Sequence, residues 1–370
     1  MTSRERLLNT VRRQPVDRVP ISLYELSQFE GSAYASFANA EPSYRRLLDA
    51  MKGRTDCLYM KKPEIRYPGI EAVTEKTVWQ EENSVFERTV LHTPKGDLTR
   101  LTRQDKDIFT VWVLEHFLKT PEDILAYQSL DLTCRADGSP LEEARAMIGE
   151  EGLVCPTIDD PICRACDLFS MEDFLVYAIS EPEGAQAFLD FLWELTREET
   201  AQILRADVRD MMFRIVGPEY ATPPYLPDRF FHDFVTVYVQ RLVEMIHDAG
   251  AVSRVHSHGK VRYALSELAT TGVMCVDPLE PLPDGDISLA EVKALYGDRM
   301  TLMGNVELKE LEQDTPEQID ALVRGVMADG KPGGGFILLP TATPINIPLN
   351  PRTEENLLQF IESGLRYGQY

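Results

Sequence analysis

The sequence predicts a single α/β domain in which eight parallel strands alternate with helices and close into a (β/α)₈ TIM-type barrel. Short apolar runs, each bounded by turn residues or charges, alternate along the chain with segments of helical periodicity. Alternating units of this kind form parallel sheets through right-handed crossovers. The chain has 370 residues, 44% of them hydrophobic, which is enough for one barrel with one core. We therefore expect residues 1–370 to form one domain.

Eight apolar runs are the expected strands. They lack the strict alternation of half-exposed strands, as expected where both faces are buried. In chain order they are RVPISLY (18–24), CLYM (57–60), LVCPTI (153–158), DMMFRIVG (210–217), AVSRVHS (251–257), VMCVDP (273–278), MTLMGN (300–305) and GFILLP (335–340).

One segment departs from this alternation. Residues 77–104, TVWQEENSVFERTVLHTPKGDLTRLTRQ, alternate apolar and polar positions around TPKGD. That pattern is typical of antiparallel hairpins. Because the segment follows the second expected strand, we expect an insertion that caps or flanks the barrel.

Helices are expected between the strands. The stretch from Asp228 to Asp248 carries an apolar stripe at helical spacing. A Ser-x-x-Glu pattern, Ser180 to Glu183, predicts that a long helix begins there with a capping box. Thr315 followed by proline predicts the start of another helix, which should end at a glycine.

Composition excludes several classes of partner. The formal net charge is −22 and the pI about 4.7, which argues against nucleic acid or an anionic membrane surface. No apolar run reaches the ~20 residues that span a bilayer, and the first residues do not resemble a signal peptide. The lone CxxC, Cys163 and Cys166, has no second pair, so the six cysteines are expected to be free thiols in the cytoplasm.

Polar residues follow the expected strands where a barrel's active site forms, at the carboxyl ends. They are Tyr24 and Glu25, Glu219 and Tyr220, His256 and His258, Asp277 and Glu280, and Asn305 and Glu307. We expect a small-molecule site on this rim. The members expected to contact the substrate are Tyr24, Glu25, Tyr220, Asn305 and Glu307.

The two close-spaced histidines suggest a divalent metal site. His256 and His258 are two residues apart, so in an extended chain they face the same side. Two imidazoles with a carboxylate suit zinc, and Glu219 is the expected third ligand. Asp277 and Glu280 flank a proline turn and are the expected catalytic acid–base residues. The alternative is one histidine hydrogen-bonded inside the barrel and the other solvated.

The run KPGGGF, residues 331–336, superficially resembles a phosphate-binding loop. It precedes an expected strand, whereas such a loop should follow a strand and open a helix. We therefore expect no phosphate site there.

Several motifs in sequential order resemble the uroporphyrinogen decarboxylase superfamily. They are SRERLLNTVRRQPVDRVPI, GPEYATPPYLPDRFF, VHSHG, DPLEPLPDGDI, LYGDRMTLMGNVE and GGGFILLP followed by EENLLQFIESGLRYG. The resemblance covers nearly the whole chain and implies a (β/α)₈ barrel. It also implies one of two chemistries: cofactor-free decarboxylation of uroporphyrinogen, or zinc-dependent methyl transfer with a cobalamin-binding corrinoid protein.

The true decarboxylases carry an Arg-rich, RQAGR-like motif just after the first strand. The matching place here reads YELSQFEGS, with Glu25 and Glu30 and no arginine. A substrate bearing many carboxylates would be repelled there. The resemblance is therefore closer to the methyltransferase branch.

The zinc site of that branch resembles His-x-Cys-Gly plus a late Cys. Here His256 matches the first ligand, His258 stands at the first Cys, and LPTATPIN offers only Thr341 and Thr343 at the late position. Nitrogen and oxygen ligands make a harder, more Lewis-acidic metal, which suits an O-methyl substrate. We expect metal-assisted methyl transfer to a corrinoid protein, with cobalamin only on that partner. The resemblance is also compatible with a homodimer.

Two other functions fit the same residues. One is a metal-independent decarboxylase or lyase acting on a small carboxylated substrate, with His256 or His258 as proton donor. The other is a non-catalytic barrel that binds a small molecule after losing the metal site, which the missing late Cys supports.

Overall fold

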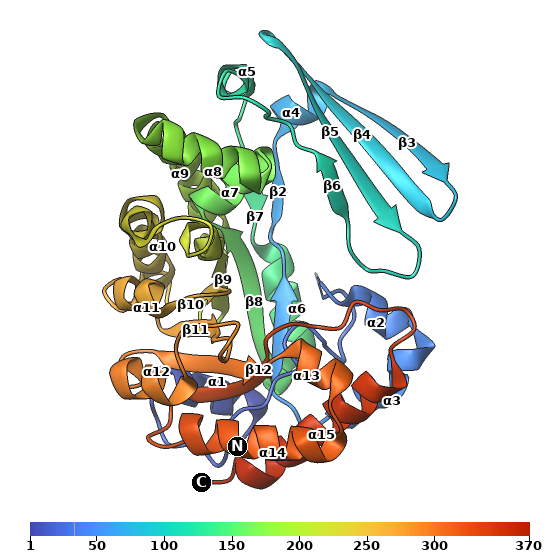
Figure 1. Cartoon of the computed structure of the whole chain (residues 1–370), viewed down its shortest axis with the longest axis vertical. Coiled ribbons are helices and arrows are strands. Elements are labelled where there is room, and N and C mark those ends of the chain that lie inside the picture. The colour runs from blue at the N-terminus through green and yellow to red at the C-terminus, as the bar shows by residue number, and fades with distance from the viewer. Residues whose placement is uncertain (33) are drawn as a thin grey trace.

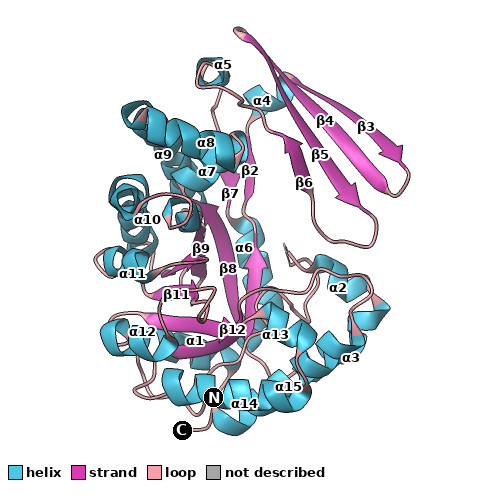
Figure 2. Cartoon of the chain, viewed as in Figure 1, coloured by secondary structure: helices cyan, strands magenta, loops and turns pink. Residues whose placement is uncertain are grey.

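The computed structural model describes residues 1–32 and 34–370. Seven of the expected strands form one parallel sheet whose helices lie on its outer side (Figures 1 and 2). In spatial order the strands are β1 (Cys57–Lys61), β8 (Gly152–Asp159), β9 (Met212–Val216), β10 (Val252–Ser257), β11 (Cys275–Pro278), β12 (Thr301–Val306) and β13 (Phe336–Pro340).

The first expected strand, residues 18–24, closes this sheet into a barrel. Ile21 forms a parallel bridge with Leu338 of β13, and the Ser22 N–H donates to the Leu338 carbonyl at 2.9 Å. On the other side the Asp56 N–H donates to the Ile21 carbonyl at 2.6 Å, beside β1. Pro20 has no N–H to donate, so pairing here stays limited to a bridge instead of a ladder. The predicted (β/α)₈ barrel is confirmed.

A buried carboxylate holds this closing segment in place. Asp56 is fully buried, and its Oδ1 accepts a hydrogen bond from Arg6 at 2.6 Å. Its Oδ2 accepts from the Arg18 guanidinium at 2.6 Å and from the Ile21 N–H at 2.8 Å. Asp56 therefore ties the first helix, the closing segment and the start of β1 to one point.

Helices surround the barrel. They are α1 (Ser3–Val11), α2 (Ser36–Ala40), α3 (Arg45–Met51), α4 (Pro68–Ala72), α5 (Asp123–Tyr127), α6 (Ser139–Ile148), α7 (Pro161–Leu168), α8 (Met171–Ser180), α9 (Pro182–Ile203), α10 (Val237–Asp248), α11 (Arg262–Leu268), α12 (Leu289–Tyr296), α13 (Leu308–Gln313), α14 (Pro316–Gly330) and α15 (Pro351–Tyr367). Short 3₁₀ segments are η1 (Pro42–Tyr44), η2 (Gly149–Glu151), η3 (Pro218–Ala221) and η4 (Asp228–Phe230), and η5 (His232–Thr236) is a π-helix. Within the described residues, none of the helices combines the length and apolarity needed to cross a membrane.

The barrel has two apolar layers. One lies between sheet and helices. The other fills the barrel interior and includes Leu58, Met60, Leu153, Cys155, Met212, Val252, Cys275, Met303, Ile337 and Leu339. Because the interior is packed with side chains, a ligand can enter only at the barrel ends or between flanking elements.

Two of the three expected helix starts differ from the structure. Ser180 is the last residue of α8, and its hydroxyl donates to the Val176 carbonyl at 2.7 Å instead of capping α9. The N-cap of α9 is Glu181, without a side-chain cap, so the predicted capping box is wrong. The stretch from 228 begins with η4 and η5, and regular α-helix starts only with α10. The capping box of Thr315 is confirmed.

The insertion is a four-stranded antiparallel sheet that projects from the barrel (Figure 1). Its strands are β3 (Thr74–Glu81), β4 (Ser84–Thr93), β5 (Gly96–Asp105) and β6 (Trp112–Glu115), so the hairpins predicted over 77–104 are confirmed and extended. A small antiparallel pair, β2 (Glu64–Arg66) and β7 (Arg135–Asp137), lies at its base. The loop between β5 and β6 pairs with the segment after β13: the Phe109 N–H donates to the Ile345 carbonyl at 3.1 Å.

Asp56→Asn should destabilise the whole fold. The substitution leaves Arg6 and Arg18 without their shared buried counter-charge, a loss that costs about 3–5 kcal/mol in buried ion pairs. We expect the free energy of unfolding in urea to fall by about that amount. The control is Asp49→Asn, because loss of the exposed Asp49–Lys52 pair should hardly change stability. Equal effects of the two substitutions would contradict the role assigned to Asp56.

Candidate active site at the carboxyl ends of the strands

A buried ion pair lies at the centre of the barrel. Arg254 of β10 is completely buried, and its Nε and Nη2 donate to the two oxygens of Asp277 on β11 at 2.5 and 2.6 Å. Burial alone would raise the pKa of Asp277. The charge of Arg254 and the hydrogen bonds from Arg254 and His256 nevertheless hold that pKa well below its ordinary value. Asp277 is therefore a permanent anion inside the barrel.

His256 is oriented by the same carboxylate. Its Nδ1 lies 2.8 Å from Asp277 Oδ2, and the two residues are Cα partners across the β10–β11 ladder. Burial and the positive charge of Arg214 lower the pKa of His256 to about 3, so the ring is neutral near pH 7. Because ionised Asp277 can only accept, Nδ1 carries the proton and Nε2 keeps a free lone pair. The Tyr24 hydroxyl lies 3.3 Å from both ring nitrogens.

His258 is held by a second carboxylate. Its Nδ1 lies 2.6 Å from Glu280 Oε1, while Glu280 Oε2 accepts the Gly259 N–H at 2.6 Å. Burial lowers the pKa of His258, but the hydrogen bond and charge of Glu280 outweigh it and raise that pKa. The two imidazole rings are 4.6 Å apart between centroids and perpendicular. Two adjacent histidines therefore have pKa values shifted in opposite directions, an arrangement typical of active sites.

A second buried arginine forms the neighbouring wall. Arg214 of β9 is the Cα partner of Arg254 and is 4% exposed. Its Nη1 donates to Glu25 Oε1 at 3.3 Å, its Nη2 donates to the Tyr24 hydroxyl, and its guanidinium lies over the rings of Tyr24 and Tyr34, 5.4 Å from each centroid. Burial raises the pKa of Glu25 despite the Arg214 charge. Tyr24 and Glu25, two of the expected substrate contacts, thus lie together with His256.

The sequence reasoning missed both arginines, because it considered only the residues that follow each strand. A signal was available within the strands. Arg214 and Arg254 interrupt the otherwise apolar runs MFRIV and VSRV. Arg254 is two residues before His256, and residues two apart in a strand face the same side. A charged residue in phase with a site residue therefore indicated a buried ionic group in the barrel.

Glu219 and Tyr220 lie on the side of the rim next to α7. Burial raises the pKa of Glu219, and its Oε2 is buried without a hydrogen-bond partner in the described chain. Asp160 caps α7 by accepting the Cys163 N–H at 2.8 Å, and burial raises its pKa well above the ordinary value. Cys163 and Cys166 are both on α7, and all six cysteines are free thiols. Burial on this side of the rim therefore favours the protonated forms of its acids and thiols.

The remaining two candidates, Asn305 and Glu307, do not join the histidines. Glu307 Oε2 accepts a hydrogen bond from the Thr341 hydroxyl at 2.8 Å, in the segment after β13. Asn305 borders a separate cavity of about 340 Å³ between α12 and α14, with Leu289 and Leu322. Neither side chain hydrogen-bonds to His256 or His258 in the part of the chain that the structure describes.

The imidazole and carboxylate groups of this site are of the type that binds a borderline metal such as zinc. Each histidine has its Nδ1 tied to a carboxylate, which is the usual support of a metal-ligating imidazole and makes Nε2 the nitrogen that would bind the metal. The unpartnered Glu219 Oε2 supplies an oxygen of the expected type. However, among residues 1–32 and 34–370 no three His, Cys, Asp or Glu side chains are gathered closely enough to hold an ion. A three-ligand site is therefore not preformed in this arrangement.

Comparison with known proteins identifies the family. The sequence pattern of the uroporphyrinogen decarboxylase (URO-D) family matches residues 141–353, more than half of the chain. A solved structure, the methyltransferase from Methanosarcina mazei, is similar over 98% of both chains with a TM-score of 0.61 and 17% sequence identity, which shows a shared fold. No protein with a curated description matches the sequence significantly. The chain belongs to the uroporphyrinogen decarboxylase family.

Proposed function

We propose that this chain is a methyltransferase-like enzyme that moves a methyl group from a small O-methyl substrate to a corrinoid protein, with the help of a divalent metal, zinc. The observation that carries the proposal is the pair of histidines whose Nδ1 atoms are each tied to a carboxylate. Family membership and the fold shared with a methyltransferase support an enzyme of this kind. Cobalamin would be carried only by the partner protein.

The residues that would hold zinc are His256 and His258 through Nε2, and Glu219 through its carboxylate. When bound, the metal supplies Lewis-acid polarisation of the oxygen that carries the methyl group. The carboxylates expected to be catalytic, Asp277 and Glu280, act in this proposal by orienting the two imidazoles, because their oxygens are already engaged by protein donors.

The rest of the site binds the substrate and supplies a proton. Tyr24 and Arg214 form a polar wall beside His256. Glu25 has a pKa raised by burial, so it can hold a proton and deliver it to the oxygen released when the methyl group leaves. Close packing around these groups keeps bulk water away from them. Six free thiols suit a reducing, cytoplasmic environment.

The His256→Ala/His258→Ala double variant should lose metal. Protein purified without chelator and supplied with zinc should contain close to one zinc per chain by mass spectrometry, and the double variant should contain almost none. The control, His92→Ala/His232→Ala, removes two exposed histidines and should keep the metal. Absence of metal from the unaltered protein, even after zinc is added, would refute the metal-assisted mechanism.

Glu280→Gln should weaken zinc binding without removing a ligand. Loss of a carboxylate that supports a metal-binding histidine typically lowers metal affinity about 10- to 100-fold. A zinc titration against a chromophoric chelator measures the change. Glu291→Gln, in an exposed pair with Arg262, serves as the control and should leave the affinity unchanged. If both variants bind zinc as the unaltered protein does, then Glu280 has no supporting role.

A specific observation favours a second function, metal-independent decarboxylation of a small carboxylated substrate. Arg254 Nη1 and Arg214 Nε are buried and have no hydrogen-bond partner in the described chain. Arginine is the preferred partner of carboxylates. The protonated form of His258, favoured by its raised pKa, would supply the proton that replaces the lost carboxyl group.

Small methoxylated aromatic acids distinguish the two functions, because each carries both reactive groups. With a reduced corrinoid protein present, methyl transfer yields the corresponding hydroxy acid and a methylated corrinoid. Decarboxylation yields carbon dioxide and a methoxyarene, and it proceeds in metal-free protein without the corrinoid. Product analysis by mass spectrometry with and without chelator identifies which of these reactions occurs.

A further inference from the structure

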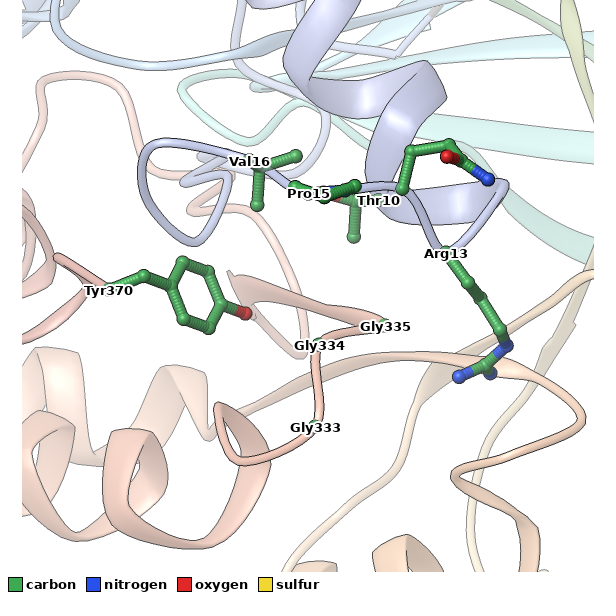
Figure 3. A pocket seen from close by; sticks show the side chains of 9 residues that line it. Thr10, Arg13, Pro15, Val16, Gly333, Gly334, Gly335 and Tyr370 are labelled. Carbon is green, nitrogen blue, oxygen red and sulfur yellow. The ribbon is translucent and has the colours of Figure 1, made fainter.

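A cavity of about 410 Å³ lies at the amino-terminal end of the barrel, opposite the candidate active site. It is bordered by the loop after α1 (residues 13–16), the three glycines before β13 (residues 333–335) and Tyr370 (Figure 3). The marked chain ends lie at this end of the molecule (Figure 1). Its size falls in the ~300–1,000 Å³ range of small-molecule sites.

The glycine loop presents backbone groups to this cavity. Gly333, Gly334 and Gly335 have φ of 77°, 72° and 61°, a conformation that residues with a side chain rarely adopt. A Cβ on Gly335 would lie only 2.8 Å from Arg13 Nη1, so glycine also permits the arginine to approach. Gly334 N–H donates to the Lys331 carbonyl, whereas the amides of Gly333 and Gly335 have no acceptor within the described residues. Free backbone amides in a tight glycine turn can bind an anion.

Two cations stand beside the loop without a carboxylate partner. Arg13 donates to the carbonyls of Gly297 and Met300 at 2.5 and 2.6 Å, and Lys293 of α12 donates to the Gly334 carbonyl. Neither forms a salt bridge within the described residues, although the chain carries a net charge of −22. Burial and the Arg13 charge lower the pKa of Lys293 to about 8. Arg13 lines the cavity and Lys293 lies behind the Gly334 carbonyl, so two uncompensated positive charges favour an anionic ligand here.

An aromatic side chain completes the cavity. The Tyr370 ring points toward the glycine loop from the opposite side (Figure 3). Its hydroxyl donates to the Lys331 carbonyl at 3.4 Å, which restrains the ring. Pro15 and Val16 add apolar surface. A ligand that filled this space would therefore present an anionic group to Arg13 and the glycine loop and a planar, partly apolar group to Tyr370.

We propose that this cavity binds a small organic phosphate of the nucleoside monophosphate type. Arg13 and the free amides of the glycine loop would hold the phosphate, the charge of Lys293 behind the Gly334 carbonyl would attract it, and the planar ring would lie against Tyr370. The KPGGGF run does not open a helix, as the usual phosphate-binding loop does. Here the loop acts with cations from α12 and from the turn after α1. The site is independent of the proposed methyl transfer, and because it lies at the opposite end of the barrel, its ligand would be an effector.

Calorimetric titration of the full chain with AMP, inorganic phosphate and adenosine tests this proposal. We expect AMP to bind and adenosine not to bind. The Arg13→Met/Lys293→Met variant should lose at least tenfold in AMP affinity. The matched control, Arg12→Met/Lys309→Met, makes the same change in charge at two exposed positions paired with Asp210 and Asp284, and should bind AMP normally. Thermal unfolding confirms that both variants are folded.

Each other outcome is decisive. Binding of inorganic phosphate as tightly as AMP would support the anion site and assign it to free phosphate. Binding of adenosine as tightly as AMP would overturn the proposal, because the cations would then have no role. Failure of both AMP and phosphate to bind at millimolar concentration would overturn it too, as would unchanged binding in the Arg13/Lys293 variant.

Anion binding should be coupled to proton uptake by Lys293. Arg13 is the charged group that faces this ammonium, and the Gly334 carbonyl is its other contact. With a pKa of about 8 in the free protein, Lys293 is about half protonated at pH 8, and a bound phosphate favours the charged form. AMP affinity should therefore fall as the pH rises from 7 to 9. Calorimetry in two phosphate-free buffers of different ionisation enthalpy should show net proton uptake at pH 8.

Lys293→Met should abolish this proton uptake, whereas Lys309→Met should not change it. A pH-independent AMP affinity between pH 7 and 9 would show that the charge of Lys293 does not contribute to anion binding.

Discussion

A positive charge at the centre of the barrel must be neutralised, and the rim is organised by the way in which this is done. Arg254 is fully buried, and Asp277 on the next strand engages it through both oxygens. The same carboxylate fixes the His256 ring. Because a buried ion pair tolerates little displacement, it also fixes how β10 and β11 lie against each other. Glu280, which follows the end of β11, contacts His258 in the same way. The orientation of His256 therefore follows from the Arg254–Asp277 pair, and that of His258 follows from Glu280.

The rim divides into two halves with different electrostatics. On the histidine side, burial and the charge of Arg214 keep His256 neutral, whereas the carboxylate of Glu280 favours the charged form of His258. On the α7 side, burial favours the neutral forms of Asp160 and Glu219 and of the nearby thiols. One barrel mouth therefore contains a neutral imidazole on one side and, on the other, acids whose pKa values are raised by burial.

The sequence predicted the barrel well because each strand is a short apolar run, and that pattern depends only on burial. It predicted less well the features that depend on which side chains pair with one another. The rim positions of Tyr24, Glu25 and His256 could be read from the strand ends, but not that Asp277 and Glu280 would be occupied in holding imidazoles. Arg214 and Arg254 lay inside the strands, where only apolar residues were expected. The Ser180 motif failed because nothing local shows that α8 continues to that residue. The two cations near the glycine run could not be predicted from local order, because they come from segments distant in the sequence.

Closure of the barrel also has a consequence for how the protein is made. The sheet keeps a free edge until Ile21 pairs with Leu338, which is near the other end of the chain. During synthesis the segment around Ile21 emerges first and must wait for β13, while the insertion hairpins can form at once from neighbouring residues. Until β13 leaves the ribosome, the nascent chain exposes the edge of its last completed strand and one face of the Ile21 segment. Unpaired edges of this kind bind other chains. The interval before closure is therefore when the chain is most exposed to pairing with other chains.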